Sequence, residues 1–293
     1  MTRRGRGVFA CVPRRCSLLI LALLVFLSLA GLVTKVALPV MGMAYGTRLP
    51  VIMYHSVLNS RARSGQYVIS VDVVRTDFEW IKTHGYTAVL PSELYDAVSK
   101  GRPLPEKPVM ITLDDGFLNN LTYLLPLLEE FDFKAVVAVV GSYSERFTQN
   151  HDPNPAYAYL SWDEINKLLD SGRIEIANHS YDMHRQNPRH GVKRLLGEDA
   201  QNYYAALVKD VGNTQSLLEQ NCGILPTAFA YPFGAVNRES RSILMEMGFT
   251  SLFTCEEKVN ILTGKTDELL SLGRFNRAAG DTTSSFMKRT GIT

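Results

Sequence analysis

The chain has 293 residues, enough for one large domain or two small ones, and its 46% apolar and 20% charged residues are ordinary for a globular protein. The net charge of +2 is unevenly distributed: five arginines lie within residues 1–16, whereas residues 45–293 hold 25 basic and 29 acidic side chains. This slightly acidic body excludes a nucleic-acid binder that relies on bulk positive charge, because such binders need basic patches to displace phosphate counterions.

The first 44 residues have the pattern of a targeting or anchoring segment. A basic stretch that ends at Arg15 precedes an apolar run, and residues 18–38 are long enough to span a bilayer. The positive end should stay in the cytoplasm, so that the following chain is exported. Gly42 and Ala44 offer a cleavage site, and residues 1–44 are therefore interpreted as a basic tail plus either a retained anchor or a cleaved signal peptide.

Residues 45–293 are expected to form one domain outside the cytoplasm, held at the cell membrane or, after cleavage near Ala44, secreted or bound to the cell wall. Disulfides are allowed there, and this part contains Cys222 and Cys255. Nothing in the sequence brings the two cysteines together. Two buried free thiols are therefore the favoured interpretation, with a disulfide as the alternative.

The domain alternates between predicted strands and predicted helices. Short apolar runs bounded by polar clusters predict strands over residues 51–54, 108–113, 134–140, 173–177, 228–231, 249–253 and 271–275. Amphipathic segments, several with glycine stops, predict helices over residues 78–84, 92–100, 120–131, 161–172, 199–220 and 237–247. The helix that begins at Ser161 starts with a capping box, and Trp162 within it is expected to belong to the core.

This alternation predicts a parallel α/β fold. The strands are short and apolar, and no glycine-rich dinucleotide turn follows the first one, so the pattern favours a distorted (β/α)7-type barrel over a doubly wound sheet. Residues 142–159, which are polar and contain two prolines, are predicted to be the longest loop and to form a rim over a site. In such folds the active site lies at the C-terminal ends of the strands.

Two of these strand ends carry residues suited to a metal. Asp114 and Asp115 follow the strand predicted over 108–113, and adjacent carboxylates repel each other unless a cation or proton lies between them. His179 and His184 follow a later strand, at a spacing that suits a loop folded around a metal better than one face of a helix. A plain Asp-Gly turn and a surface histidine pair are the ordinary alternatives.

Two further strand ends add polar groups. Pro232 and Gly234 flank Phe233 in a turn that can aim backbone N–H groups into a cleft, and His55 ends the first strand. Each has an ordinary explanation when taken alone. Together, one carboxylate and two imidazoles make a metal site with open positions, the second carboxylate is left as a base, and the extra histidine is a candidate acid.

The motifs resemble those of the NodB-homology polysaccharide deacetylases, carbohydrate esterase family 4. The first three motifs of that family are matched by Leu113-Asp114-Asp115-Gly116-Phe117, by residues 178–184 and by Ala230-Tyr231-Pro232-Phe233-Gly234. Residues 51–55 and Gly273-Arg274-Phe275-Asn276-Arg277 resemble the branch that deacetylates poly-β-1,6-N-acetylglucosamine in biofilm exopolysaccharides. The resemblance extends from Leu49 to Arg277.

The resemblance implies a role for each matched residue. Asp115, His179 and His184 would bind a divalent metal ion, typically zinc, with nickel or cobalt sometimes accepted. Asp114 would be the general base that acts on the attacking water. The backbone N–H of Phe233 would stabilise the oxyanion.

Two departures from the family pattern concern the base and the acid. Most members have an arginine where this chain has Ala230, and Arg274 is the candidate to orient the base instead. Most members also take the acid from a histidine near the C-terminus, but no histidine follows His190 in this sequence. In the exopolysaccharide branch the acid comes from an N-terminal strand, and His55 fits that place.

The implied activity is hydrolysis of N-acetyl groups on an N-acetylglucosamine polymer by a monomer, with acetate and a free amine as products. Tyr181 and Tyr231 are the expected substrate-binding residues. The alternatives are a deacetylase of peptidoglycan or chitin oligomers and a degenerate member that only binds polysaccharide. The intact carboxylate and histidine set speaks against the last of these.

Overall fold

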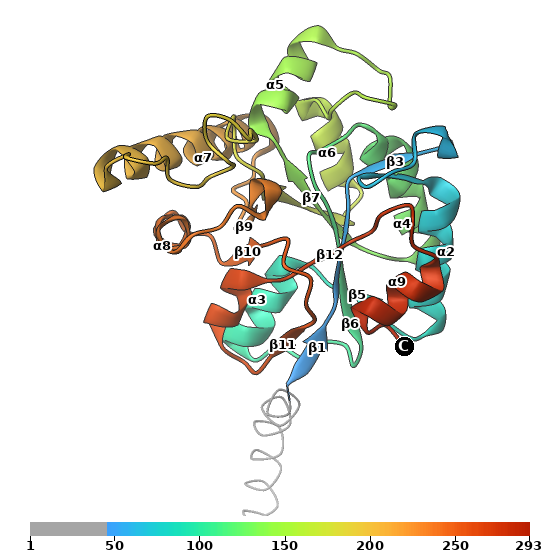
Figure 1. Ribbon diagram of the computed structural model, residues 1–293. Helices are drawn as coiled ribbons and strands as arrows, with labels where there is room; N and C mark the ends of the chain where they lie inside the picture. Colours follow the sequence, from blue (N-terminus) through green and yellow to red (C-terminus); the bar gives the residue numbers. More distant parts are fainter. Residues whose placement is uncertain (1–45) are drawn as a thin grey trace, which may run out of the picture.

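The computed structural model describes residues 46–293 (Figure 1). The predicted anchor or signal peptide within residues 1–44 lies outside this part of the chain. Within residues 46–293 no helix is both long and apolar enough to cross a bilayer.

A curled parallel sheet forms the centre of the molecule, as the alternation of strands and helices predicted. Its hydrogen-bonded order is β10–β9–β8–β7–β6–β2–β12, and β5 (Thr87–Ala88) pairs separately with β6. The strands of the main path are β2 (Val51–Tyr54), β6 (Pro108–Leu113), β7 (Ala135–Val139), β8 (Ile174–Asn178), β9 (Ala228–Ala230), β10 (Ser251–Phe253) and β12 (Phe275–Asn276). Neighbouring strands on this path run parallel, so their C-terminal ends share one edge.

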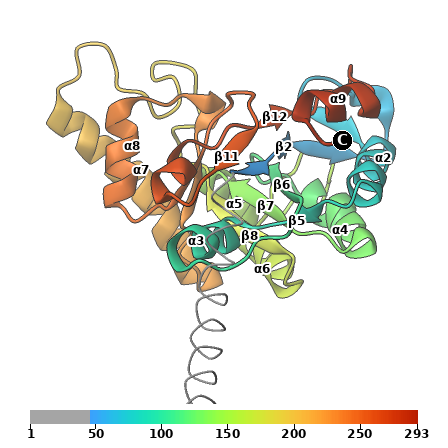
Figure 2. The same cartoon turned by 90° about the horizontal axis from the view of Figure 1, so that it is seen from below.

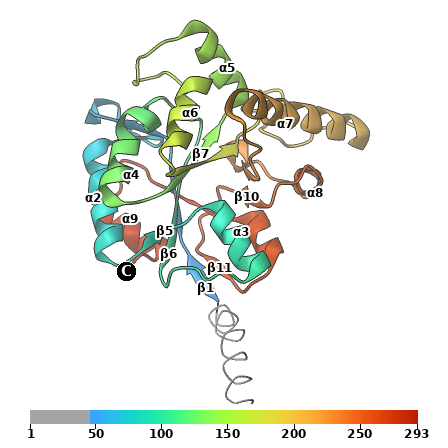
Figure 3. The same ribbon diagram turned by 180° about the vertical axis from the view of Figure 1, so that it is seen from behind.

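Helices surround the outside of this sheet (Figures 1 and 3). They are α2 (Val71–Thr83), α3 (Pro91–Lys100), α4 (Leu125–Phe131), α5 (Gly141–Asn150), α6 (Trp162–Asp170), α7 (Ala200–Cys222), α8 (Arg238–Glu246) and α9 (Thr283–Thr290). A π-helical turn, Asn120–Leu124, leads into α4, and 3-10 turns cover Arg61–Arg63, Pro232–Gly234 and Thr266–Ser271. Two small sheets pair β1 (Thr47–Leu49) with β11 (Asn260–Leu262) and β3 (Ser56–Leu58) with β4 (Val68–Ser70).

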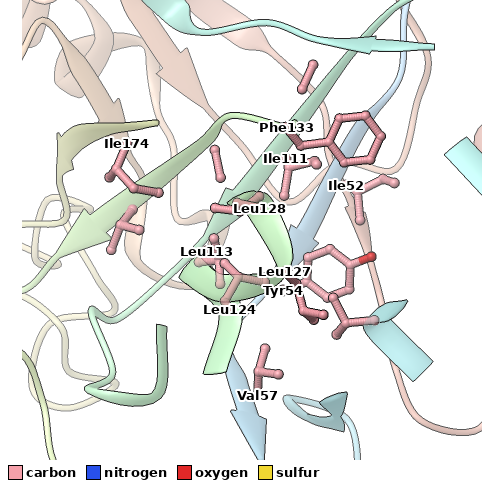
Figure 4. Close-up of a cluster of buried hydrophobic side chains, with 14 of the residues drawn as sticks. Ile52, Tyr54, Val57, Ile111, Leu113, Leu124, Leu127, Leu128, Phe133 and Ile174 are labelled. Atoms are coloured by element: carbon pink, nitrogen blue, oxygen red, sulfur yellow. The ribbon is translucent and has the colours of Figure 1, made fainter. Parts of the chain in front are cut away.

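The main core lies between the sheet and its helices (Figure 4). Every residue of β2, β6 and β7 is buried, which explains why these strands read as continuous apolar runs and not as an alternation. Ile111 and Leu113 of β6 pack with Leu124 and Leu128 in one buried cluster. Burial of each such side chain contributes roughly 1.5–3 kcal/mol.

One segment connects the two edges of the curled sheet. Leu272 forms a parallel bridge with Phe253 of β10, and three residues later Phe275 of β12 pairs with Ile52 of β2. Figure 2 shows β12 beside β2. The last strand therefore lies over Phe275–Asn276 and overlaps the range predicted for it, residues 271–275, only at Phe275. Residues 272–276, which we call the closing segment, bring the late part of the chain beside its first long strand.

The prediction of a long loop over residues 142–159 is wrong in its first half, because α5 covers Gly141–Asn150. Tyr143 and Phe147 of this helix are spaced i,i+4 and both pack against Tyr159. The predicted capping box is present, with Ser161 and Glu164 bonded reciprocally, and Trp162 is buried as expected.

Cys222 and Cys255 are both free thiols in the part of the chain that the structure describes. The expectation that both are buried is wrong. Cys222 is half-buried and Cys255 is exposed, because Cys255 follows the end of β10 at the open edge of the sheet.

Candidate active site

Three predicted ligands meet at the C-terminal edge of the sheet. Asp115 follows β6, His179 follows β8, and His184 lies five residues further along the same loop. One donor atom from each lies within 4.8 Å of the others, with Asp115 Oδ1 at 3.6 Å from His179 Nε2 and 3.1 Å from His184 Nε2. Asp115 adopts a left-handed backbone (φ 72°), which turns its carboxylate away from the strand direction.

A hydrogen bond fixes the direction of the His179 ring. Its Nδ1 lies 2.8 Å from the carbonyl oxygen of Ala230, at the end of the neighbouring strand β9. A proton on Nδ1 leaves the lone pair of Nε2 directed at Asp115, which is the arrangement that metal-binding histidines adopt. The ring is almost completely buried, so it has little freedom to turn.

The loop that carries His184 is held by α7. Asp210 accepts hydrogen bonds from the backbone N–H groups of Tyr181 and Asp182, both at 2.9 Å. Asn178 supports the turn from the other side by accepting the N–H of Ser180 at 2.8 Å. These bonds define the path of the chain between the two histidines, which is why a spacing of five residues brings both rings to one carboxylate.

The donor set fits a divalent cation. Burial disfavours the charge on Asp115, yet the adjacent imidazoles of His179 and His184 hold the pKa of its carboxyl below the usual range. An ionised carboxylate with two imidazoles is a ligand set for zinc and related metals, and it leaves further coordination positions open. The three residues thus form a candidate metal site.

Asp114 is held by an arginine from the far end of the chain. Arg274 Nη1 and Nη2 lie 2.6 and 2.8 Å from the two carboxylate oxygens, and both side chains are buried. Burial opposes ionisation, but the positive charge of Arg274 lowers the pKa of Asp114. Arg274 also donates from Nε to the carbonyl of Thr254 at 3.0 Å, so the guanidinium is fixed on two sides.

His55 lies beside the same carboxylates, because β2 is the neighbour of β6 in the sheet. Its ring packs against Tyr67 with centroids 4.7 Å apart, and its Nδ1 is buried without a hydrogen-bond partner. Burial lowers the pKa of His55, while the charges of Asp114 and Asp115 act in the opposite direction. The structure therefore brings His55 to the site.

Phe233 forms a strained turn on the other side of the histidines. Its backbone is left-handed (φ 58°, ψ 13°), and its ring lies 4.6 Å from the His184 ring and 5.4 Å from the His190 ring. The turn packs closely on the chain after β10: a Cβ on Gly234 would lie 2.7 Å from Cys255 Cβ. Glycine is required there, and the tight contact fixes the direction of the neighbouring peptide groups.

The two predicted substrate-binding tyrosines have different surroundings. Tyr181 is partly exposed and donates to Glu145 at 2.5 Å, and this hydrogen bond raises the pKa of the tyrosine to about 12. Tyr231 is completely buried against Phe229, so its side chain does not reach the site surface. The expectation for Tyr231 is corrected on this ground: it follows β9 directly, and its ring is packed in the core.

Sequence reasoning missed an aromatic wall beside the metal site. Tyr159 stacks on Phe117 with centroids 4.7 Å apart and also contacts Tyr143, whose hydroxyl lies 3.5 Å from His184 Nδ1. A cavity of about 360 Å³ adjoins this wall and is lined by Ser142, Tyr143, Arg146, Asp182, His184 and Arg185. The i,i+4 spacing of Tyr143 and Phe147 was the signal in the sequence that this region is a helix with an aromatic face.

A curled parallel sheet with a carboxylate and two histidines at its C-terminal edge is the arrangement that the deacetylase motifs predicted. The family described as polysaccharide deacetylase matches residues 101–252, which is more than half of the chain. The chain therefore belongs to the polysaccharide deacetylase family, and its domain is of the NodB type that the motifs predicted.

Among similar proteins, poly-β-1,6-N-acetyl-D-glucosamine N-deacetylase of Escherichia coli strain K12 is 25% identical over 224 residues, covering 70% of this chain and 33% of the relative. The enzyme of the same name from Staphylococcus aureus strain MRSA252 is 23% identical over 193 residues, covering 66% of this chain and 62% of the relative. The chain thus spans about a third of the length of the first relative and less than two thirds of the second.

Solved structures show the same fold. A de-N-acetylase from Aggregatibacter actinomycetemcomitans superposes with a TM-score of 0.69 at 25% identity, covering 82% of this chain and 99% of that one. IcaB from Ammonifex degensii superposes with a TM-score of 0.68 at 24% identity, covering 84% and 97%. These similarities confirm the predicted α/β class with a curled parallel sheet.

Proposed function

We propose that this protein is a metal-dependent hydrolase that removes N-acetyl groups from an N-acetylglucosamine polymer, with the β-1,6-linked exopolysaccharide as the favoured substrate. The observation that carries the proposal is the Asp115, His179 and His184 cluster directly beside the buried pair of Asp114 and Arg274. The names of the E. coli and S. aureus relatives support the choice of polymer.

Asp115, His179 and His184 would hold the metal, with zinc as the first candidate and nickel or cobalt as others. When bound, such an ion polarises the acetyl carbonyl and makes a water molecule a better nucleophile at neutral pH. The chain's own contribution at this point is to keep the two imidazole lone pairs and one carboxylate directed at a common position.

Asp114 serves as the proton acceptor for the attacking water. Arg274 keeps its carboxylate ionised and fixed, so that the base is always available in one orientation. The backbone N–H of Phe233 donates to the oxygen that becomes negative when water adds to the carbonyl carbon. His55 gives a proton to the departing nitrogen, and the carbon–nitrogen bond breaks to release acetate and a free amine.

The composition of residues 1–44 supports a location for the domain outside the cytoplasm, at the membrane or in the cell wall. We propose that the domain, residues 45–293, acts there as a monomer on polysaccharide. Fractionation of cells that produce the full chain, followed by N-terminal sequencing, distinguishes a retained anchor from cleavage near Ala44.

The direct test offers acetylated β-1,6-linked glucosamine oligomers and β-1,4-linked oligomers to the purified protein with added zinc. Free amine and acetate are measured for each. We expect release from the β-1,6 oligomers above release from the β-1,4 oligomers. Faster release from the β-1,4 oligomers would assign the enzyme to chitin-like or peptidoglycan-like substrates, and binding without release from any oligomer would contradict the proposal.

A further inference from the structure

A second buried ion pair joins α2 to the residue that follows β12, and it takes no part in the mechanism above. Asp77 of α2 and Arg277 are both completely buried, and the guanidinium grips the carboxylate with two bonds, Nε to Oδ2 at 2.8 Å and Nη2 to Oδ1 at 3.1 Å. The remaining Nη1 donates to the carbonyls of Ala278 and Asp281 at 2.8 and 2.9 Å. A buried charged group needs hydrogen-bond partners of this kind to offset the free energy lost when it leaves water.

Asp77 also holds the strand that pairs with β12. The hydroxyl of Tyr54, the last residue of β2, donates to Asp77 Oδ2 at 3.0 Å. On the other side, Arg277 follows β12 directly and its backbone N–H donates to Met53 at 3.0 Å. One carboxylate thus binds the side chain of the last residue of β2 and that of the first residue after β12, and it fixes the position of one strand relative to the other.

The register of β12 decides whether Arg274 can reach Asp114. β12 has only two residues, Phe275 and Asn276, so its ladder contains few hydrogen bonds to specify an alignment. A slip of one residue in a strand moves every side chain to the opposite face. Arg274 and Arg277 stand on either side of this short strand, three positions apart, and they bind Asp114 and Asp77 respectively.

We propose that Asp77 and Arg277 are positioning residues for deacetylation: their ion pair locks the register of β12 on β2, so that Arg274 arrives in place to orient Asp114. The claim rests on the proposed function, in which Asp114 is the base. Asp77 occupies an apolar position of α2, between the buried Val74 and Phe78, as expected for a charge kept for a specific partner.

The test replaces the pair by apolar residues of similar size, Asp77→Leu with Arg277→Met, because removal of one partner alone would leave an uncompensated buried charge. We expect kcat on the acetylated oligomer to fall at least about tenfold, KM to change less than about threefold, and metal content to be kept, since the ligands follow β6 and β8. Arg277→Lys keeps the charge but loses the bidentate contact, and its kcat should lie between those of wild type and the double variant. If the double variant fails to fold, a fall in kcat in Arg277→Lys is the test.

A matched control removes stability without touching the strand pair. Leu168 is completely buried on α6, which packs against α5, α7 and β8, and Leu168→Ala should lower the resistance to urea while kcat stays within about twofold. When Arg274→Met is already present, adding Asp77→Leu and Arg277→Met should lower kcat by less than about a further twofold. The pair acts by placing Arg274, and that side chain is already absent. An equal fall in kcat in the control, or full additivity with Arg274→Met, would overturn the proposal.

Cys255 provides a readout that does not depend on activity. Its Sγ lies 4.0 Å from Arg274 Nη2. Although the residue is exposed, neighbouring protein atoms partly desolvate the thiol and raise its pKa; Arg274 lowers this pKa, and Asp114 and Asp115 raise it. The rate of Cys255 alkylation by iodoacetamide is measured as a function of pH by peptide mass spectrometry, with Cys222 as internal reference. The midpoint of this pH–rate profile reports where the guanidinium lies. Arg274→Met should raise this midpoint, and Asp77→Leu with Arg277→Met should raise it too, whereas Leu168→Ala should not.

The two readouts separate two kinds of failure. If the wild-type protein deacetylates none of the oligomers, the proposed function fails, and the Cys255 midpoint still tests whether the buried pair places Arg274. A midpoint that moves in Arg274→Met but not in the double variant would refute the positioning role, whatever the activity.

Discussion

At the scale of single residues, the direction of one imidazole depends on one carbonyl. His179 donates to Ala230 and so presents its second nitrogen to Asp115, while His184 approaches the same oxygen from the loop. We expect about one divalent ion per chain, and we expect His179→Ala or His184→Ala to lose the ion and the activity together. Elemental analysis after dialysis measures this, with His84→Ala as the control; full occupancy when both ligands are replaced would disprove the site.

The neighbouring aspartates should separate into two roles. Asp114→Asn removes the base but leaves Asp115 in place, so we expect the metal to be retained and the rate to fall by about 10²–10⁴-fold, the range typical of general acid–base catalysis. Asp115→Asn should instead lose the metal. Metal content and initial rates measured on both variants decide the assignment, and the opposite pattern would exchange the two roles.

His55 is predicted to serve the leaving group. His55→Ala should keep the metal and lower amide turnover by about 10²-fold or more, because an amine leaves poorly without a proton. An activated ester needs less assistance, so its hydrolysis should fall less in the same variant. The ratio of amide to ester rates is the informative quantity: equal losses would indicate that His55 only positions the substrate.

At the scale of elements, the loop between β8 and α7 is tied by a partly buried ion pair. Arg189 Nη2 lies 2.6 Å from Glu198 Oε1, and Glu198 also accepts the N–H of Leu195 at 2.9 Å. The hydrogen bond from Arg189 comes first among the causes that lower the pKa of Glu198. Since the folded pKa is lower than the unfolded one, the pair stabilises the fold above the unfolded pKa of about 4.3 and loses that contribution as the pH falls through the folded pKa.

Glu198→Gln should therefore lower the free energy of unfolding at pH 7, and the difference from wild type should shrink toward zero at pH 3. Urea unfolding at the two pH values measures this difference, and the control is Glu129→Gln, at an exposed position of α4. A constant difference at both pH values would mean that the charge of Glu198 does not contribute.

The elements show what the sequence could reveal. The strands β6 and β7 were predictable because burial on both faces leaves an unbroken apolar run, and the chemistry at the end of β6 followed from Asp114 and Asp115. The helix α5 was missed because its polar sequence begins without a capping side chain, so only the aromatic spacing marks it. β12 is too short to carry a pattern of its own, and its position depends on partners elsewhere in the chain.

Within the site, too, contacts between residues far apart in the sequence could not be predicted from local patterns. The resemblance to a known family supplied Arg274 as the partner of Asp114, although 160 positions separate the two residues. Asp77 and Arg277 are 200 positions apart, and no local pattern connects them. Tyr231 was misassigned because its side chain is buried in the core, and the motif alone does not reveal where the side chain that follows a strand points.

At the scale of the whole molecule, the closing segment joins the last part of the sheet to the first. β2 and β12 pair in parallel although more than 200 residues separate them, and the main sheet path ends at this contact. Contacts between such distant parts of a chain form late in folding, because a large loop must close before they can contribute.

This arrangement sets an order of events during synthesis. A growing polypeptide presents Asp114, Asp115, His179 and His184 long before Arg274 exists, since chains are made from the N-terminus. Until residues 272–277 have joined β2, Asp114 has no arginine to fix it. Newly made chains would thus be able to capture a metal ion before they can turn over substrate, and activity would begin only after residues 272–277 have been made and have joined β2.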